Sequence, residues 1–248
     1  MDNVKPSSFT RRELLQKGAL VLLLGTLPSI GLTPVGAQER PQPSQGADTG
    51  SRKAPETLPV EDLMREHGVL RRTLLVYEEI IRRLTDGKEF PPQTLPTAAG
   101  VIRNFIESYH EKLEEDFLFP RFEKAGKLVD LVAVLRRQHQ VGRRVTDEIL
   151  KLGKPEALKT PELQKQLADY LRWFIRMYRP HAAREDTVLF PAFHFLVTAG
   201  EYEALGEDFE RKEQALFGED GFEKMVAQVA SLEKQLGLDN LAQFTPKI

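Results

Sequence analysis

Residues 110–120 read HEKLEEDFLFP and residues 181–191 read HAAREDTVLFP, and these two stretches decide the fold. Each begins with a histidine, has a glutamate four residues later and ends in Leu-Phe-Pro. An α-helix makes one turn in about 3.6 residues, so the histidine and the glutamate project roughly 40° apart on one face. The pattern therefore predicts two matching helices, one with His110 and Glu114 and the other with His181 and Glu185.

The segments before these stretches repeat as well. Residues 63–72 read LMREHGVLRR and residues 135–144 read LRRQHQVGRR, which places His67 and His139 at matching positions. Each half of the repeat is then a helical hairpin, with one histidine on its first helix and the His-x-x-x-Glu pair on its second. Two such hairpins packed about a pseudo-twofold axis bring four imidazoles and two carboxylates together.

Apolar residues recur at helical spacing over four long segments. These segments cover residues 63–81, 101–117, 128–152 and 161–197, and stretches with proline or glycine separate them. No segment shows the alternation typical of a β-strand. We therefore predict an all-α protein, an antiparallel up-down four-helix bundle, with additional C-terminal helices over residues 201–238 that break at residues 218–221.

The composition excludes several kinds of function. Lys and Arg number 35 against 37 Asp and Glu, so the chain lacks the basic excess of a nucleic-acid-binding protein. It has no cysteine, which excludes disulfides, thiolate metal sites and cysteine nucleophiles. Any metal must therefore be held by histidine and carboxylate side chains.

The repeated His-x-x-x-Glu pairs favour metal binding. A single pair is better explained as an exposed ion pair worth about 0.2–0.5 kcal/mol, but two pairs in register outweigh that interpretation. On the apolar face of a bundle, an unpaired carboxylate loses hydration worth several kcal/mol, and a bound cation cancels this cost. Nitrogen and oxygen ligands without sulfur suit iron, manganese or zinc, and helical bundles commonly hold two such ions.

The first 37 residues predict an export signal. Arg11 and Arg12 precede a mostly apolar stretch that is too short to span a membrane, and Val35-Gly36-Ala37 supplies small residues for cleavage after Ala37. The segment resembles a twin-arginine signal, which implies export of a folded protein to the periplasm or another extracytoplasmic compartment. We expect no stable membrane span after cleavage.

Composition also sets the expected domain boundaries. Residues 38–59 contain four prolines, two glycines and few large apolar residues, so we expect a flexible linker there. The folded domain is then expected over residues 60–238, and a short tail over residues 239–248. The predicted signal peptide covers residues 1–37.

With these motifs, the chain resembles the hemerythrin-like, or HHE cation-binding, domains. The resemblance covers about residues 59–237 and rests on REHGVL at 65–70, YHEKLEEDFLFP at 109–120 and HAAREDTVLFP at 181–191. It implies two iron ions joined by an oxo or hydroxo bridge inside a four-helix bundle, with manganese or zinc less expected. It also implies which residues hold the metal: His67, His110, His139 and His181 as terminal ligands, and Glu114 and Glu185 as bridges.

The sequence departs from the oxygen-carrying members of that family near the third-helix histidine. Those proteins have a second histidine four residues away, but here the positions around His139 hold Leu135 and Arg143. Glu111 lies about 100° round the helix from His110, and it is either a replacement ligand or a solvated surface charge.

The last carboxylate is also open to two assignments. The oxygen carriers place an aspartate five residues beyond the fourth-helix histidine, and Asp186 stands at that position here. Internal symmetry favours Glu185 instead. Among nearby side chains, we expect His194 to be structural or at the surface, and we expect Tyr109, Trp173 and Tyr178 to lie in the core.

These observations predict a non-haem di-iron protein that binds or responds to a small molecule such as O2, NO or peroxide. A ligand set poorer in imidazole suits sensing, iron handling or peroxide chemistry better than simple O2 carriage. One alternative is a di-iron oxidase or peroxidase with the same ligands. Another is a structural or zinc-binding helical bundle that acts through a protein partner, which the sequence does not identify.

Overall fold

The computed structural model describes residues 58–248, and the predicted signal peptide and nearly all of the predicted linker lie outside this range. All secondary-structure elements in the described part of the chain are helices, which confirms the predicted all-α class. No helix among these residues is both long enough and apolar enough to cross a membrane.

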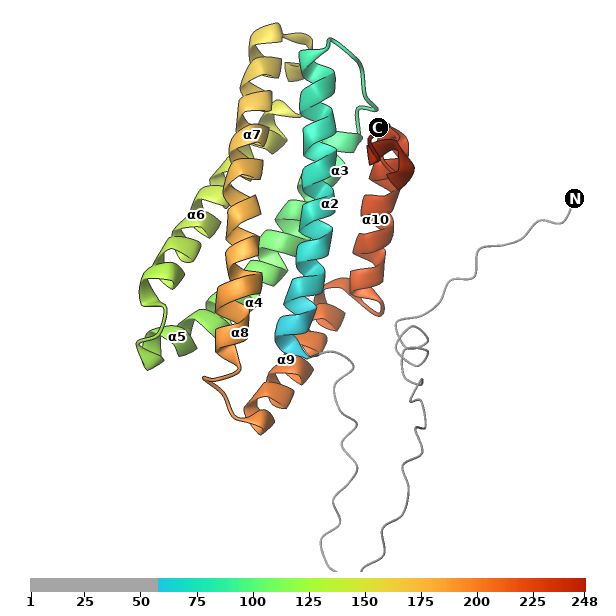
Figure 1. The fold of residues 1–248 in the computed structure, drawn as a ribbon. Coiled ribbons are helices and arrows are strands. Elements are labelled where there is room, and N and C mark those ends of the chain that lie inside the picture. Colours follow the sequence, from blue (N-terminus) through green and yellow to red (C-terminus); the bar gives the residue numbers. More distant parts are fainter. Residues whose placement is uncertain (1–57) are drawn as a thin grey trace, which may run out of the picture. The chain divides into compact units, whose positions relative to one another are not determined.

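Four long helical runs dominate the described part of the chain (Figure 1). The first is α2 (Pro59–Thr85) and the third is α6 (Val129–Leu152). The second run consists of α3 (Thr94–Val101), η1 (Ile102–His110), α4 (Glu111–Leu113), η2 (Glu114–Leu118) and α5 (Phe119–Ala125). The fourth follows the short turn η3 (Ala157–Lys159) and consists of α7 (Pro161–Arg184), η4 (Glu185–Leu189) and α8 (Phe190–Phe193). The chain continues with α9 (Ala199–Phe217), α10 (Gly221–Leu236) and η5 (Leu241–Phe244).

The long runs pack around one hydrophobic core. α7 contacts both α2 and α6, and the segment formed by α3 and η1 also contacts α2 and α6. The C-terminal helices cover one side, since α10 lies against α2 and α3 and α9 lies against α2 (Figure 1). This packing brings residues from all four runs to one place in the core.

Local sequence explains several helix ends. Pro59 stands in the first turn of α2, where its missing N–H leaves no helical hydrogen bond unmade. Gly126 takes a left-handed conformation with φ of 62°, which ends α5. Thr198 and Glu201 form a capping box that begins α9, and the predicted break at residues 218–221 separates α9 from α10.

In addition to the π-helical η1, two short π-type turns interrupt the second and fourth runs at matching positions. The N–H of Phe119 donates to the carbonyl of Glu114, and the N–H of Phe190 donates to the carbonyl of Glu185, five residues back rather than four. A proline follows each phenylalanine and cannot donate to the carbonyl four residues before it. These π-type turns are η2 and η4, and each begins at a glutamate of the repeated motif.

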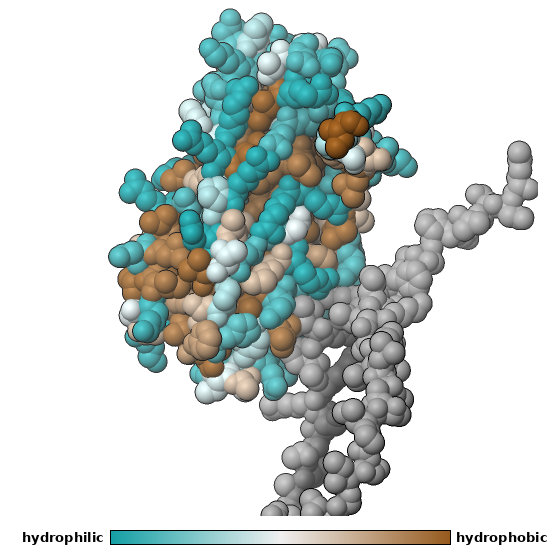
Figure 2. Space-filling model, in the orientation of Figure 1, coloured by the Kyte–Doolittle hydropathy of each residue, from teal (hydrophilic) through white to brown (hydrophobic). Residues whose placement is uncertain are grey.

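The core contains two of the three aromatic residues expected there. Tyr109 and Tyr178 are buried, but Trp173 is 58% exposed, so its predicted place in the core is wrong. Trp173 falls outside the stripe of α7 that is buried at Leu171, Phe174 and Tyr178, which follows the helical period. Other apolar side chains reach the surface near the connection of α5 to α6 (Figure 2), where Leu128, Val129 and Val134 are exposed.

Candidate metal centre

The four repeat histidines come together in the core, one from each helical run. His67 lies on α2, His110 ends η1, His139 lies on α6 and His181 lies on α7, and all four are buried. They form two pairs, because the Nε2 atoms of His67 and His110 are 3.1 Å apart and those of His139 and His181 are also 3.1 Å apart. The Nε2 atoms therefore face one another in pairs inside the core.

Glu114 and Glu185 lie between these two pairs. Glu185 places Oε2 3.3 Å from His67 Nε2 and Oε1 3.1 Å from His181 Nε2. Glu114 places Oε1 3.8 Å from His110 Nε2 and Oε2 3.4 Å from His139 Nε2. Each carboxylate thus offers one oxygen to each histidine pair, as expected of a carboxylate that bridges two metal ions.

The outer nitrogen of each imidazole is held by a second side chain. Nδ1–H of a neutral imidazole donates to such an acceptor, which leaves the Nε2 lone pair directed into the centre. The four Nδ1 contacts are His67 to Asp186 at 2.7 Å, His110 to Glu66 at 2.7 Å, His139 to Glu115 at 3.1 Å and His181 to Gln138 at 2.8 Å.

Two arginines hold two of these acceptors in turn. Arg71 forms an ion pair with Asp186, and Arg143 forms one with Glu115 at 2.6 Å. Both arginines stand at matching positions of the repeat, four residues after His67 and His139. Each half of the repeat therefore contributes one series of contacts that runs from an arginine through a carboxylate to an imidazole.

Phenylalanine rings from the repeated Leu-Phe-Pro motifs cover the centre. Phe190 stacks on His67 and Phe119 stacks on His139, each with ring centroids 5.5 Å apart. Both phenylalanines are completely buried. They separate the imidazoles from solvent and fix the plane of each ring.

The two central carboxylates have no hydrogen-bond donor among the described residues. All four oxygens of Glu114 and Glu185 are buried and accept no hydrogen bond. Burial raises the pKa of Glu114 well above its usual value, and the charge of Glu185 raises it further. Burial also lowers the pKa of His110 well below its usual value, which favours the neutral imidazole that a metal requires.

This arrangement fits a pair of metal ions. Orphaned carboxylate oxygens are costly in a core, and two adjacent carboxylates repel each other unless a cation or a proton lies between them. The donor set contains only imidazole nitrogen and carboxylate oxygen, which suits iron, manganese or zinc. The buried groups able to hold an ion include Glu114 with His139, His181 and Glu185, and His67 with His110 and Glu114.

Glu111 and Asp186 lie outside this central cluster. Glu111 accepts hydrogen bonds from the Tyr178 hydroxyl and, at 2.8 Å, from Arg143, and it is buried, so it is not a solvated surface charge. Together with Glu115 and His139 it forms a further group that could hold an ion. Asp186 contacts the outer nitrogen of His67 instead of the inner one. His194 is at the surface beside Tyr202, as expected from its lack of a repeat partner.

Sequence reasoning missed the residues that hold the imidazoles from outside. Glu66 and Gln138 each precede a repeat histidine, and Glu115 and Asp186 each follow a repeat glutamate. The repeat register contained this signal, because matching positions on matching helices face the same neighbours. Without that register, a polar residue beside a ligand is expected to face solvent.

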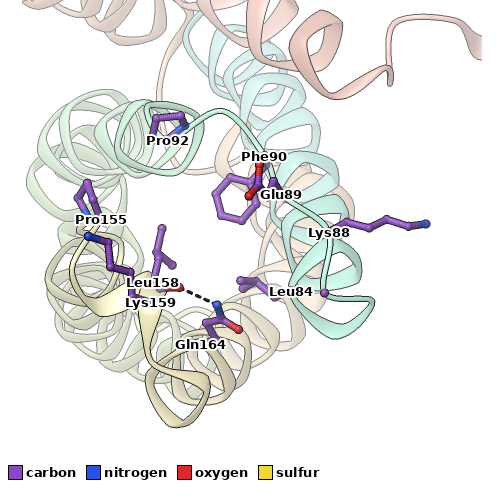
Figure 3. A pocket seen from close by; sticks show the side chains of 10 residues that line it. Leu84, Lys88, Glu89, Phe90, Pro92, Pro155, Leu158, Lys159 and Gln164 are labelled. Carbon is purple, nitrogen blue, oxygen red and sulfur yellow. Dashed lines mark hydrogen bonds between the residues drawn. The ribbon is translucent and has the colours of Figure 1, made fainter.

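A separate cavity of about 420 Å³ lies between the turn after α2 and η3 (Figure 3). Phe90 and Leu158 line it, and Gln164 donates a hydrogen bond of 2.6 Å to the carbonyl of Leu158. Its lining has no histidine and no aspartate. This cavity therefore offers no group of metal ligands and has no part in the centre.

Comparison with known proteins identifies the family. The hemerythrin HHE cation-binding domain matches residues 58–193, which is more than half of the chain. The chain belongs to the hemerythrin HHE cation-binding family. Cation binding by this HHE domain agrees with the buried cluster of histidine and glutamate, which has the composition of a metal site.

Relatives of this HHE protein match it over nearly its whole length. They include uncharacterized protein Mb2018 of Mycobacterium bovis and uncharacterized proteins MT2051 and Rv1995 of Mycobacterium tuberculosis. Each is 43% identical over 248 residues, covering 99% of this chain and 94% of the relative. No solved structure matches the chain significantly.

Proposed function

We propose that this HHE protein holds two iron ions in the buried centre and responds through them to O2, NO or peroxide. A single observation supports the metal pair: four buried carboxylate oxygens accept no hydrogen bond, and each lies 3.1–3.8 Å from an imidazole Nε2. We define the first position as the one beside His67 and His110, and the second as the one beside His139 and His181.

Each position has two imidazole nitrogens and one oxygen from each of Glu114 and Glu185. Iron accepts more than four ligands, so such a set leaves room for an exogenous ligand. When bound, the metals supply electrons and open coordination positions for a small diatomic molecule or peroxide. The chain orients the imidazoles through the Nδ1 contacts and excludes bulk water with Phe119 and Phe190.

We assign Glu111 and Asp186 to supporting roles. In this proposal Asp186 orients His67, and Glu111 anchors Tyr178 and Arg143. With only two imidazoles at each position, the centre favours the ferric state more than a nitrogen-rich carrier does. Sensing, iron handling or peroxide chemistry fits this better than prolonged O2 carriage.

The finer architecture and the location are part of the same proposal. We propose that the four long runs form an antiparallel up-down bundle, because short connections join successive runs of similar length. We also propose export through the twin-arginine-type sequence at residues 1–37. A di-iron oxidase or peroxidase would use the same ligands, and turnover with a reductant and peroxide would reveal that activity.

The test is the metal content of the full chain, together with its visible and near-ultraviolet spectrum before and after exposure to O2, NO and peroxide. We expect two irons per chain and a spectrum that changes with at least one of these ligands. Glu114→Ala is expected to lose both the metal pair and the spectral response. Glu203→Gln, on the exposed side of α9, is expected to keep both. A wild-type protein that folds with zinc alone, or with no metal, would overturn the iron proposal.

A further inference from the structure

The contacts that hold the imidazoles from outside are symmetric in position but not in charge. The repeat pairs Asp186 with Glu115, and both are acidic. It also pairs Glu66 with Gln138, and there the match fails. His110, in the first metal position, therefore faces a carboxylate at 2.7 Å, whereas His181, in the second, faces a neutral amide oxygen at 2.8 Å.

This difference acts directly on the metal ligands. A carboxylate that accepts a hydrogen bond from Nδ1–H draws the proton outward and makes the opposite nitrogen a stronger donor to a metal. A neutral amide oxygen does this less. The Glu66 side chain is 1% exposed and that of His110 is 2% exposed, so solvent screens the contact very little.

The outer contacts of His67 and His139 also favour stronger metal binding at the first position. In the first position, Asp186 gives Oδ1 to His67 and Oδ2 to Arg71, so each oxygen has its own partner. In the second position, Oε1 of Glu115 contacts both His139 at 3.1 Å and Arg143 at 2.6 Å. The shorter contact to the guanidinium weakens the pull of Glu115 on His139.

Glu111 does not strengthen the imidazole ligands of the second position. It is buried near the second position, and its repeat partner is Ala182, so it adds a carboxylate that the first position lacks at that place. Its oxygens, however, accept hydrogen bonds from the Tyr178 hydroxyl and from Arg143, and among the described residues no hydrogen bond joins Glu111 to an imidazole nitrogen. The charge of Glu111 is therefore offset by a guanidinium and does not strengthen a metal ligand.

We propose that the two metal positions differ in affinity, so that the first binds its ion tightly and the second holds an exchangeable ion. Glu66 and Gln138 are the residues that set this difference, and they act through His110 and His181 as positioning residues. The inference rests on the proposed function, because it requires a metal at each position. It assigns metal exchange to the half of the centre formed by α6 and α7.

The test is a titration of the metal-free full chain with Co²⁺ at fixed pH, in competition with a chelator of known affinity. Wild type is expected to bind two ions with affinities that differ at least tenfold. Glu66→Gln should weaken the tighter event by about 10- to 100-fold, because removal of an outer-shell partner of a ligand has that effect. Gln138→Glu is the matched variant and should strengthen the weaker event by a similar factor.

The result separates the inference from the proposed function. Wild type that binds two Co²⁺ ions with equal affinities would overturn the proposed difference in affinity and leave the metal pair standing. The same conclusion would follow if Glu66→Gln weakened neither binding event, or weakened both to the same extent. Binding of fewer than two ions by wild type would overturn both proposals. Far-ultraviolet circular dichroism of each metal-free variant verifies folding, and Gln138→Glu decides the question alone if Glu66→Gln does not fold.

Discussion

Glu114 is completely buried beside Glu185, and this position has a cost when no metal is bound. Burial and the charge of Glu185 raise the pKa of Glu114 well above the usual 4.5. A group whose pKa is higher in the folded than in the unfolded state contributes stability at low pH. That contribution is lost as the pH rises from the ordinary glutamate range through the folded pKa, so Glu114 destabilises the metal-free protein near neutral pH.

The variant Glu114→Gln removes this charge and keeps the shape of the side chain. Near neutral pH, we expect the metal-free variant to be more stable than metal-free wild type by about 1–3 kcal/mol, and the gain to shrink towards the ordinary glutamate range. Urea unfolding at several pH values measures the difference, and exposed Glu203→Gln serves as the control. A variant that is less stable than wild type near neutral pH would contradict the assignment of Glu114 as a destabilising charge.

Arg143 and Arg71 occupy matching repeat positions but support different numbers of carboxylates. Arg143 contacts both Glu111 and Glu115, and Glu111 is 1% exposed, whereas the Arg71 side chain is 50% exposed and pairs with Asp186. Arg143→Gln leaves a buried carboxylate without its cation, so we expect a loss of about 3–5 kcal/mol in the free energy of unfolding. Arg71→Gln should cost about 1 kcal/mol or less. Urea unfolding of both metal-free variants tests this, and equal losses would show that Glu111 does not depend on Arg143.

The helices themselves carry features that single-residue patterns do not show. The His-x-x-x-Glu spacing predicts a shared helix face, and the structure places His110 and His181 on the same cluster as Glu114 and Glu185. The π-type turns that begin at the two glutamates were not predicted, because the spacing of the motif shows only which residues share a helix face. In both turns, an N–H just before a proline donates to the carbonyl five residues back instead of four. Which donor reaches which carbonyl there depends on the local backbone, and the spacing of residues in the sequence does not determine it.

Gly142 and Gly68 lie inside helices α6 and α2 and provide a matched comparison. A Cβ at Gly142 would lie 2.1 Å from the Tyr178 hydroxyl oxygen, whereas a Cβ at Gly68 would meet nothing within 4 Å. Gly142→Ala should destabilise the protein by about 1–3 kcal/mol, because the steric conflict outweighs the better helix propensity of alanine. Gly68→Ala should instead stabilise it by about 0.5–1 kcal/mol. Thermal unfolding of the two variants compares these signs, and a stabilising Gly142→Ala would mean that Tyr178 moves aside without cost.

Across the whole described chain, the internal repeat made the assembly of the centre predictable. Matching hairpins can bring four imidazoles and two carboxylates together only through contacts between residues distant in sequence, and the repeat supplied that information. The outer contacts, such as Glu66 with His110, join helices whose rotation depends on packing, so spacing within one helix did not reveal them. Trp173 was misplaced for a related reason, because the buried stripe of α7 is fixed by neighbouring helices.

A metal pair held by ligands from α2, η1, α6 and α7 would also tie the four long runs into one cooperative unit. Ligands that bind only the folded state stabilise it by about 2.7 kcal/mol when free ligand is 100-fold above the dissociation constant. We therefore expect Co²⁺ or anaerobic Fe²⁺ to raise the thermal midpoint of the metal-free wild-type chain by several degrees. Removal of the metal by a chelator should reverse the shift. His110→Ala, which takes a ligand from the first position, should lose most of the increase, and an undiminished shift in that variant would place the stabilising ion outside the His–Glu cluster.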